Sequence, residues 1–250
     1  MLASGSKGNA IYISDGDTAV LFDAGLSGVE IERRLKARNL NPADLDAICV
    51  SHEHADHIQG VGVLSRRFDL PVYMTPQTAA AAEPHLGKIT QKRTLQCGSG
   101  FTIKTLQLHP FAQTQDAKDP AGFAINRTGI KNGIATDLGI PTHIVQEHLK
   151  NCTALILEAN HDPEMLANGP YPWPLKQRIM SRVGHLSNTE AKDLLEALQH
   201  KHLEHVILAH LSETNNTAER ALQEVRRALT RCRPKLWVAN QDCCGELLSI

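Results

Sequence analysis

A dense group of potential metal ligands lies in the first quarter of the chain. Residues 52–57 read His-Glu-His-Ala-Asp-His, which is the pattern H-x-H-x-D-H. Neutral imidazole nitrogens and carboxylate oxygens suit Zn²⁺, and they also suit Mn²⁺ or Fe²⁺. The alternative is a His-rich surface turn, but a chance match to this order of residues is rare. The motif therefore predicts a metal-dependent reaction at this part of the chain.

The segment before the motif indicates how these ligands are positioned. Residues 45–50 form a short apolar run with β-branched side chains, which predicts a buried strand. Loops that leave strand ends are where α/β folds usually place their chemistry. Asp137 and His210 each follow an apolar run of the same kind. Taken alone, Asp137 would be typical of a turn or a helix cap, and His210 of a buried histidine with its hydrogen bonds satisfied. Because both follow predicted strands and the motif is present, both are predicted metal ligands.

The hexad resembles the ligand motif of the metallo-β-lactamase superfamily. In that family the first two histidines bind one metal, and the aspartate and third histidine bind a second. The resemblance assigns His52 and His54 to site one, and Asp56 and His57 to site two. It implies two divalent ions, with Zn²⁺ expected first and Mn²⁺ or Fe²⁺ as alternatives.

One expected ligand departs from the family pattern. The family completes its sites with a histidine, a bridging aspartate and a final histidine, and the resemblance gives the last two roles to Asp137 and His210. Within residues 114–123, Gln115 stands where the histidine is expected. A glutamine amide offers only a neutral carbonyl oxygen, which binds borderline metals more weakly than imidazole. Site one then either binds its metal more weakly or prefers a harder metal such as Mn²⁺. His109, which lies outside the motif, is an alternative ligand for this site.

Other segments of the chain narrow the resemblance to one branch. They are similar to the YycJ/WalJ-like branch of the superfamily at residues 4–9, 157–162, 169–172, 184–188 and 210–216. That branch is associated with phosphodiesterase chemistry, including 5′-exonuclease action on DNA. The resemblance therefore implies a hydrolase that attacks a nucleic-acid phosphodiester with a metal-bound hydroxide.

A carboxylate and an imidazole in the second half suit proton transfer. Glu158 and His185 look like the Glu–His pair that tRNase Z relatives use to protonate the leaving oxygen. A carboxylate beside an imidazole favours the imidazolium, which keeps an acid available near neutral pH. With Asp56, these two are the predicted catalytic residues. The alternatives are a buried ion-pair partner for Glu158 and a helix-terminal structural residue for His185.

Two other function classes fit the same motif. The first is a hydrolase of another small ester, a thioester, a lactone or a cyclic phosphodiester, because one metal centre serves all of these substrates. The second is a non-hydrolytic binding protein whose first metal site has decayed at Gln115.

Composition limits the expected partners. The formal net charge of −1 gives no global basic field, so contact with nucleic acid requires a local patch. That patch could consist of Lys176, Arg178 and Arg182, for which the alternative is a solvated helix face. The aromatic fraction of 4% gives no evident platform on which bases would stack. No apolar run is long enough for a membrane span, and the N-terminus lacks a signal-peptide core. Six scattered cysteines favour a reducing compartment, so the expected location is the cytoplasm.

The order of the expected elements predicts an α/β fold. Apolar strand-like runs alternate with helical segments, and 250 residues fit a single domain across residues 1–250. The resemblance implies a four-layer αβ/βα sandwich with the site along one edge of its two sheets. Three local features are also predicted. Asp15-Gly16 predicts a hairpin. Residues 101–108 are expected to form one strand, and residues 131–133 a turn. Capping boxes are expected at Ser27 with Glu30 and at Ser187 with Glu190.

Overall fold

The computed structural model describes residues 1–250, which divide into two compact units. The first unit comprises Met1–Pro110, Ala117–Ala121 and Asn240–Ser249. The second comprises Phe111–Asp116, Gly122–Ala239 and Ile250. Neither unit is one continuous stretch of sequence, because the chain returns to the first unit twice. The single domain expected across residues 1–250 stays a prediction.

The first unit is built on a five-stranded sheet. Its strands follow the order β1-β2-β3-β4-β5 and span Ile11–Ser14, Ala19–Phe22, Ala47–Cys49, Val72–Met74 and Lys92–Thr94. β1 and β2 are antiparallel, and every other neighbouring pair is parallel. The hairpin expected at Asp15-Gly16 is confirmed, and Gly16 has a φ of 92° that suits a residue without Cβ.

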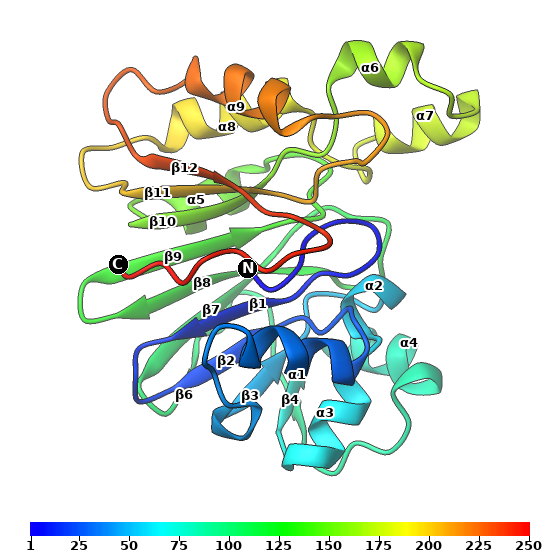
Figure 1. The fold of residues 1–250 in the computed structure, drawn as a ribbon, viewed down its shortest axis with the longest axis vertical. Coiled ribbons are helices and arrows are strands. Elements are labelled where there is room, and N and C mark those ends of the chain that lie inside the picture. Colours follow the sequence, from blue (N-terminus) through cyan, green and yellow to red (C-terminus); the bar gives the residue numbers. More distant parts are fainter. The chain divides into compact units, whose positions relative to one another are not determined.

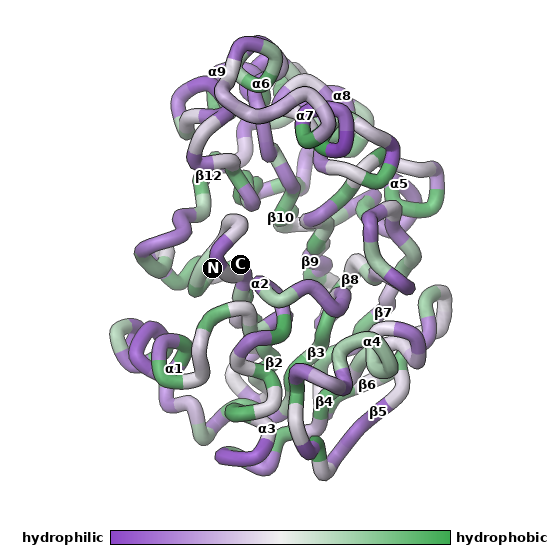
Figure 2. The backbone as a smooth tube through the Cα atoms, turned by 90° about the vertical axis from the view of Figure 1, so that its right-hand side faces the viewer, coloured by the Kyte–Doolittle hydropathy of each residue, from purple (hydrophilic) through white to green (hydrophobic).

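Helices complete the first unit and bury its apolar residues. They are α1 (Gly28–Lys36), the 3-10 helix η1 (Pro42–Asp44), α2 (Ala55–Ile58), α3 (Val61–Phe68) and α4 (Pro76–Leu86). Figure 2 shows α1 alternating between hydrophobic and hydrophilic residues, as expected of a helix with one face in the core. Ser27 caps α1 by accepting from Glu30 N at 3.3 Å. The Glu30 carboxylate does not close the expected capping box; it binds Arg33 and Arg34 instead.

The strand expected over residues 101–108 is wrong, because the chain turns within it. The structure has two antiparallel strands, β6 (Phe101–Ile103) and β7 (Leu106–Ala112). Lys104 adopts a φ of 45° between them. A left-handed residue breaks a strand, and an apolar pattern alone does not reveal it.

The second unit contains a mainly parallel group of strands. Their order is β12-β11-β10-β9-β8, with bounds Lys235–Val238, His205–Ala209, Ala154–Glu158, Ile130–Ala135 and Ala121–Arg127. β8 and β9 are antiparallel, while β9 to β12 are parallel. The turn expected at residues 131–133 is wrong, since those residues belong to β9. The hairpin turns at Thr128 and Gly129, which have φ values of 44° and 86°.

Five helices accompany these strands (Figure 1). They are α5 (His143–Leu149), α6 (Pro163–Asn168), α7 (Trp173–Ile179), α8 (Asn188–Leu198) and α9 (Ala218–Arg226). The capping box at Ser187 is confirmed, because Ser187 and Glu190 exchange both bonds. The apolar stripe of α8 is buried in this unit's core. No helix of either unit has the length and apolar character that crossing a membrane requires.

Candidate active site

Two pairs of predicted ligands converge in the first unit. His52 Nε2 lies 3.0 Å from His54 Nδ1, and His57 Nε2 lies 3.6 Å from Asp56 Oδ2. His52 and His57 are fully buried, while Asp56 is partly exposed. Since metal–ligand bonds are about 2.0–2.2 Å, either pair is close enough to share one ion. These distances are compatible with the pairing that the family resemblance implies, which stays a prediction.

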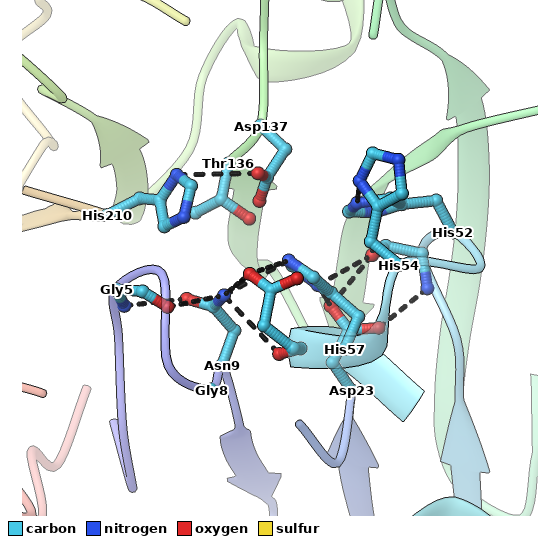
Figure 3. Close-up of polar contacts among 12 residues, drawn as sticks. Gly5, Gly8, Asn9, Asp23, His52, His54, His57, Thr136, Asp137 and His210 are labelled. Atoms are coloured by element: carbon cyan, nitrogen blue, oxygen red, sulfur yellow. Dashed lines mark hydrogen bonds and ion pairs between the residues drawn. The ribbon is translucent and has the colours of Figure 1, made fainter. Parts of the chain in front are cut away.

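A buried carboxylate that sequence reasoning missed orients the third histidine. Asp23 Oδ2 lies 2.8 Å from His57 Nδ1 (Figure 3). Ser51 holds Asp23 in place by donating its backbone N–H and its hydroxyl at 2.7 and 2.8 Å. A carboxylate at Nδ1 keeps the proton there, so Nε2 presents its lone pair, as metal-binding histidines require. A signal existed in the sequence, because Asp23 follows the apolar strand β2 as Asp137 follows β9.

The loop at residues 4–9 wraps around the ligands of the first unit. Asn9 Nδ2 lies 3.0 Å from His57 Nε2 and 3.3 Å from Asp56 Oδ2, and the Asn9 side chain also bonds Gly5 (Figure 3). A Cβ on Gly25 would lie 1.6 Å from the Asp56 carbonyl oxygen, so only glycine fits there. The loop is thus a positioning turn rather than a phosphate loop.

A second cluster occupies the strand ends of the second unit. Asp137 follows β9, Glu158 ends β10 and His210 follows β11, because parallel strands present their carboxyl ends at one edge. Glu158 Oε1 lies 2.8 Å from Nδ1 of both His185 and His210. Asp137 Oδ1 is 3.4 Å from His210 Nδ1 and 3.9 Å from His185 Nδ1. The structure therefore brings these four predicted residues together, and their ligand atoms are close enough to hold a metal ion.

Glu158 is fully buried, yet its imidazole neighbours lower the pKa of its carboxyl. Burial alone would raise the pKa of its carboxyl, but the charges and hydrogen bonds of the His185 and His210 imidazoles outweigh this effect and lower the pKa. Its other oxygen accepts from the backbone N–H groups of Leu138 and Leu186 at 2.7 and 3.3 Å. These bonds fix Glu158 as an ionised acceptor for both rings.

Gln115 lies against the second cluster at the position expected for a histidine. Its Nε2 atom is 3.4 Å from Asp137 Oδ1. When the amide is turned over, its nitrogen donates to the carbonyl oxygens of Gly184 and Val183 at 2.9 and 3.0 Å. That orientation makes two good hydrogen bonds, so it is the one expected on chemical grounds. His109, the alternative ligand, is exposed and lies against Gly100 in the first unit.

The donor chemistry of both clusters fits a divalent metal. His57 and His210 each direct Nδ1 at a buried carboxylate, which leaves Nε2 as the ligand atom. Such carboxylate–histidine pairs support metal sites built from imidazole and carboxylate. The residues present therefore match the resident metal that the motif implies.

The comparison with protein families agrees with this chemistry. Residues 18–211 match the family described as β-lactamase superfamily domain. The chain belongs to the metallo-β-lactamase superfamily.

Relatives place this superfamily member in the YycJ/WalJ-like branch. It is 39% identical over 231 residues to exodeoxyribonuclease YycJ of Bacillus anthracis, covering 92% of this chain and 88% of the relative. It is 37% identical over 225 residues to exodeoxyribonuclease WalJ of Streptococcus pneumoniae, covering 88% and 84%.

Solved structures confirm the fold. The metallo-β-lactamase-fold protein YhfI of Bacillus subtilis superposes with a TM-score of 0.75 at 16% identity, covering 96% of this chain and 94% of the other. Zn²⁺-bound PqqB of Methylobacterium extorquens gives 0.69 at 17% identity, covering 94% and 88%. The prediction of an α/β metallo-β-lactamase fold is confirmed.

Proposed function

We propose that this metallo-β-lactamase-fold protein is a metal-dependent phosphodiesterase that acts as an exonuclease on DNA. The observation that carries the proposal is the buried Glu158 carboxylate, whose Oε1 lies 2.8 Å from Nδ1 of His185 beside the Asp137–His210 donors. Two relatives of matching length are named exodeoxyribonucleases, which supports nucleic acid as the substrate. A cytoplasmic location is part of the proposal.

The proposed metal ligands are those of the sequence motif. They are His52, His54, Asp56, His57, Asp137 and His210, with Gln115 as an oxygen ligand. When bound, two divalent ions supply an activated water and neutralise charge on the phosphate oxygens. Zn²⁺ is the proposed metal, and Mn²⁺ or Fe²⁺ are the alternatives. The support is the orientation of the imidazoles within each unit and the order of the ligands in the motif.

His185 is the proposed acid for the leaving oxygen. Glu158 accepts a bond from Nδ1, so the ring is held with Nε2 away from the carboxylate. The His185 side chain is 23% exposed, whereas Glu158 is fully buried. A substrate oxygen can therefore reach the imidazole but not the carboxylate. The contact with Glu158 leaves Nε2 as the atom that would give a proton to the departing alkoxide.

The experiment pairs metal analysis with a substrate panel. The protein is purified without added metal, analysed for its elements, and assayed on 5′-phosphorylated DNA, bis-p-nitrophenyl phosphate, a thioester and a lactone. We expect bound divalent metal, hydrolysis of both phosphodiesters and release of nucleotides from the DNA end. Hydrolysis of the thioester or lactone alone would contradict the proposal, and so would a metal-free protein that no added metal activates.

A further inference from the structure

The segment around α7 exposes an unusual amount of apolar surface. Of the nine large hydrophobic side chains that are exposed in the chain, four belong to residues 173–183, and Trp173 is 62% exposed. Contiguous exposed apolar residues in a soluble protein mark a contact surface. We call this group the α7 surface; it consists of Trp173, Leu175, Arg178, Met180, Arg182 and Val183.

A buried lysine anchors α7 to the neighbouring helix. Lys176 is buried within α7, and its Nζ donates to the carbonyl oxygen of Ala167 in α6 at 2.7 Å. This bond fastens one face of α7 to the neighbouring helix. Trp173, the first residue of α7, remains exposed, and α7 lies beside α6 (Figure 1).

Positive charge is interspersed among the apolar side chains. Arg178 is 61% exposed and pairs with Asp116 at 2.8 Å, while Arg182 is exposed and has no carboxylate partner. Guanidinium groups bind phosphates, and an exposed indole stacks on any base. A purely apolar partner would leave the Arg182 charge unmatched, whereas a nucleic-acid strand suits both the apolar side chains and the arginines.

The end of α7 is hydrogen-bonded to the backbone of the proposed catalytic histidine. His185 N donates to the carbonyl oxygen of Ile179, the last residue of α7, at 3.0 Å. Gly184 N donates to Ser181 at 2.9 Å, and the Gln115 segment holds the same loop, since Asp116 N donates to Val183 at 3.1 Å. A strand bound at the end of α7 would therefore lie near His185.

We propose that the α7 surface binds an unpaired segment of the DNA substrate, with a base stacked on Trp173 and phosphates bound by Arg178 and Arg182. The inference rests on the proposed function, because it names the substrate region that the proposed site receives. It implies that a single strand is held more tightly than a dinucleotide of the same chemistry.

Fluorescence tests the stacking directly, because the chain has only two tryptophans. Trp237 lies in β12, where its Nε1 donates to His205 Nδ1 at 3.1 Å. The Trp237→Phe protein, kept metal-free so that no strand is cut, is titrated with oligodeoxythymidylate. We expect saturable quenching of Trp173 that high salt weakens. If Trp237→Phe does not fold, the natural protein is compared with Trp173→Phe, in which the quenching should disappear. Quenching that persists in Trp173→Phe overturns the proposal.

Kinetics tests the arginines against a matched control. Arg182→Ala is compared with Arg226→Ala, which removes an exposed arginine from α9 in the same unit. We expect Arg182→Ala to raise KM for a long single strand about 3- to 10-fold and to reduce the salt slope by about 1. The loss should be larger on the long strand than on bis-p-nitrophenyl phosphate, and Arg226→Ala should change neither. Equal losses from the two variants would overturn the proposal.

Two outcomes separate this inference from the proposed function. If the protein degrades DNA but Trp173 shows no quenching, the α7 surface is not the strand contact and the nuclease assignment stands. If quenching occurs but no phosphodiester is hydrolysed, the proposed function fails while the binding surface stands. The surface could instead be a contact between two copies of the chain, which sedimentation of Trp173→Ala tests. Conversion of a dimer to a monomer by this substitution would overturn the proposal.

Discussion

The Asp23 carboxylate oxygen Oδ2 lies 2.8 Å from His57 Nδ1, and both side chains are buried. This contact fixes the tautomer of His57. The sequence motif predicted His57 as a ligand but gave no indication of Asp23. Asp23→Asn should weaken metal binding about 10- to 100-fold, because an amide no longer holds the proton on Nδ1. Competition with a chelator measures this loss. Asp44→Asn, which removes an exposed carboxylate of the same unit, should bind metal like the natural protein.

The Asp56–His57 pair provides the test of the second predicted metal site. Asp56→Ala or His57→Ala should remove one metal per protein and abolish hydrolysis, because the two side chains offer ligand atoms 3.6 Å apart. Elemental analysis and the phosphodiester assay measure both effects. Full metal content in the two variants would contradict the ligand assignment.

The neutral amide of Gln115 predicts a weak first metal site. Gln115→His should tighten that site, since imidazole is a stronger ligand for borderline metals than an amide oxygen. Titration with a chelator compares the variant with the natural protein. Gln115→Met is the control that removes the amide oxygen. If neither substitution changes metal retention, Gln115 acts only as the anchor of the Val183–Gly184 carbonyls and is not a ligand.

The shared contacts of Glu158 predict different results for two neighbouring substitutions. His185→Ala should lower turnover on DNA by about 10²–10⁴ and keep the metal, because it removes only a general acid. Its effect should shrink on bis-p-nitrophenyl phosphate, whose leaving group departs without a proton. Glu158→Gln should also reduce metal retention, because Glu158 Oε1 supports His210 as well as His185. Equal rate losses for His185→Ala on both substrates would argue that His185 is structural.

Burial of His161 predicts a stability that depends on pH. Burial lowers the pKa of His161 below its ordinary 6.5; Glu158, Glu190 and Asp162 oppose the shift, and His185 adds to it. The unfolded chain therefore binds a proton more readily, so this residue's contribution is complete above about pH 6.5 and declines as the pH falls towards the folded-state pKa. Urea unfolding of metal-free protein at about pH 7.5 and 5.5 should show a smaller pH dependence in His161→Gln. An equal pH dependence in the two proteins would contradict this.

The sequence by itself determined those features whose chemistry is local. The H-x-H-x-D-H motif places its candidate ligands within six residues, so they are close together in the structure. Their pairing into two metal sites is implied by the family resemblance and stays a prediction. The Asp15-Gly16 turn and the capping box at Ser187 depend on bonds between residues close in sequence, and both were predictable. The family pattern added Glu158 and His185, whose contact the structure contains.

Only the tertiary structure decided the features that depend on distant neighbours. Asp23 reaches Ser51 and His57 because β2 and β3 pair in parallel, and no local pattern specifies that pairing. The turn at Thr128 replaced the one expected at residues 131–133, because strand register selects among nearby turn signals. No pattern in the sequence marks Trp173 as a surface residue, yet it is exposed. Its exposure is a property of packing, which composition does not encode.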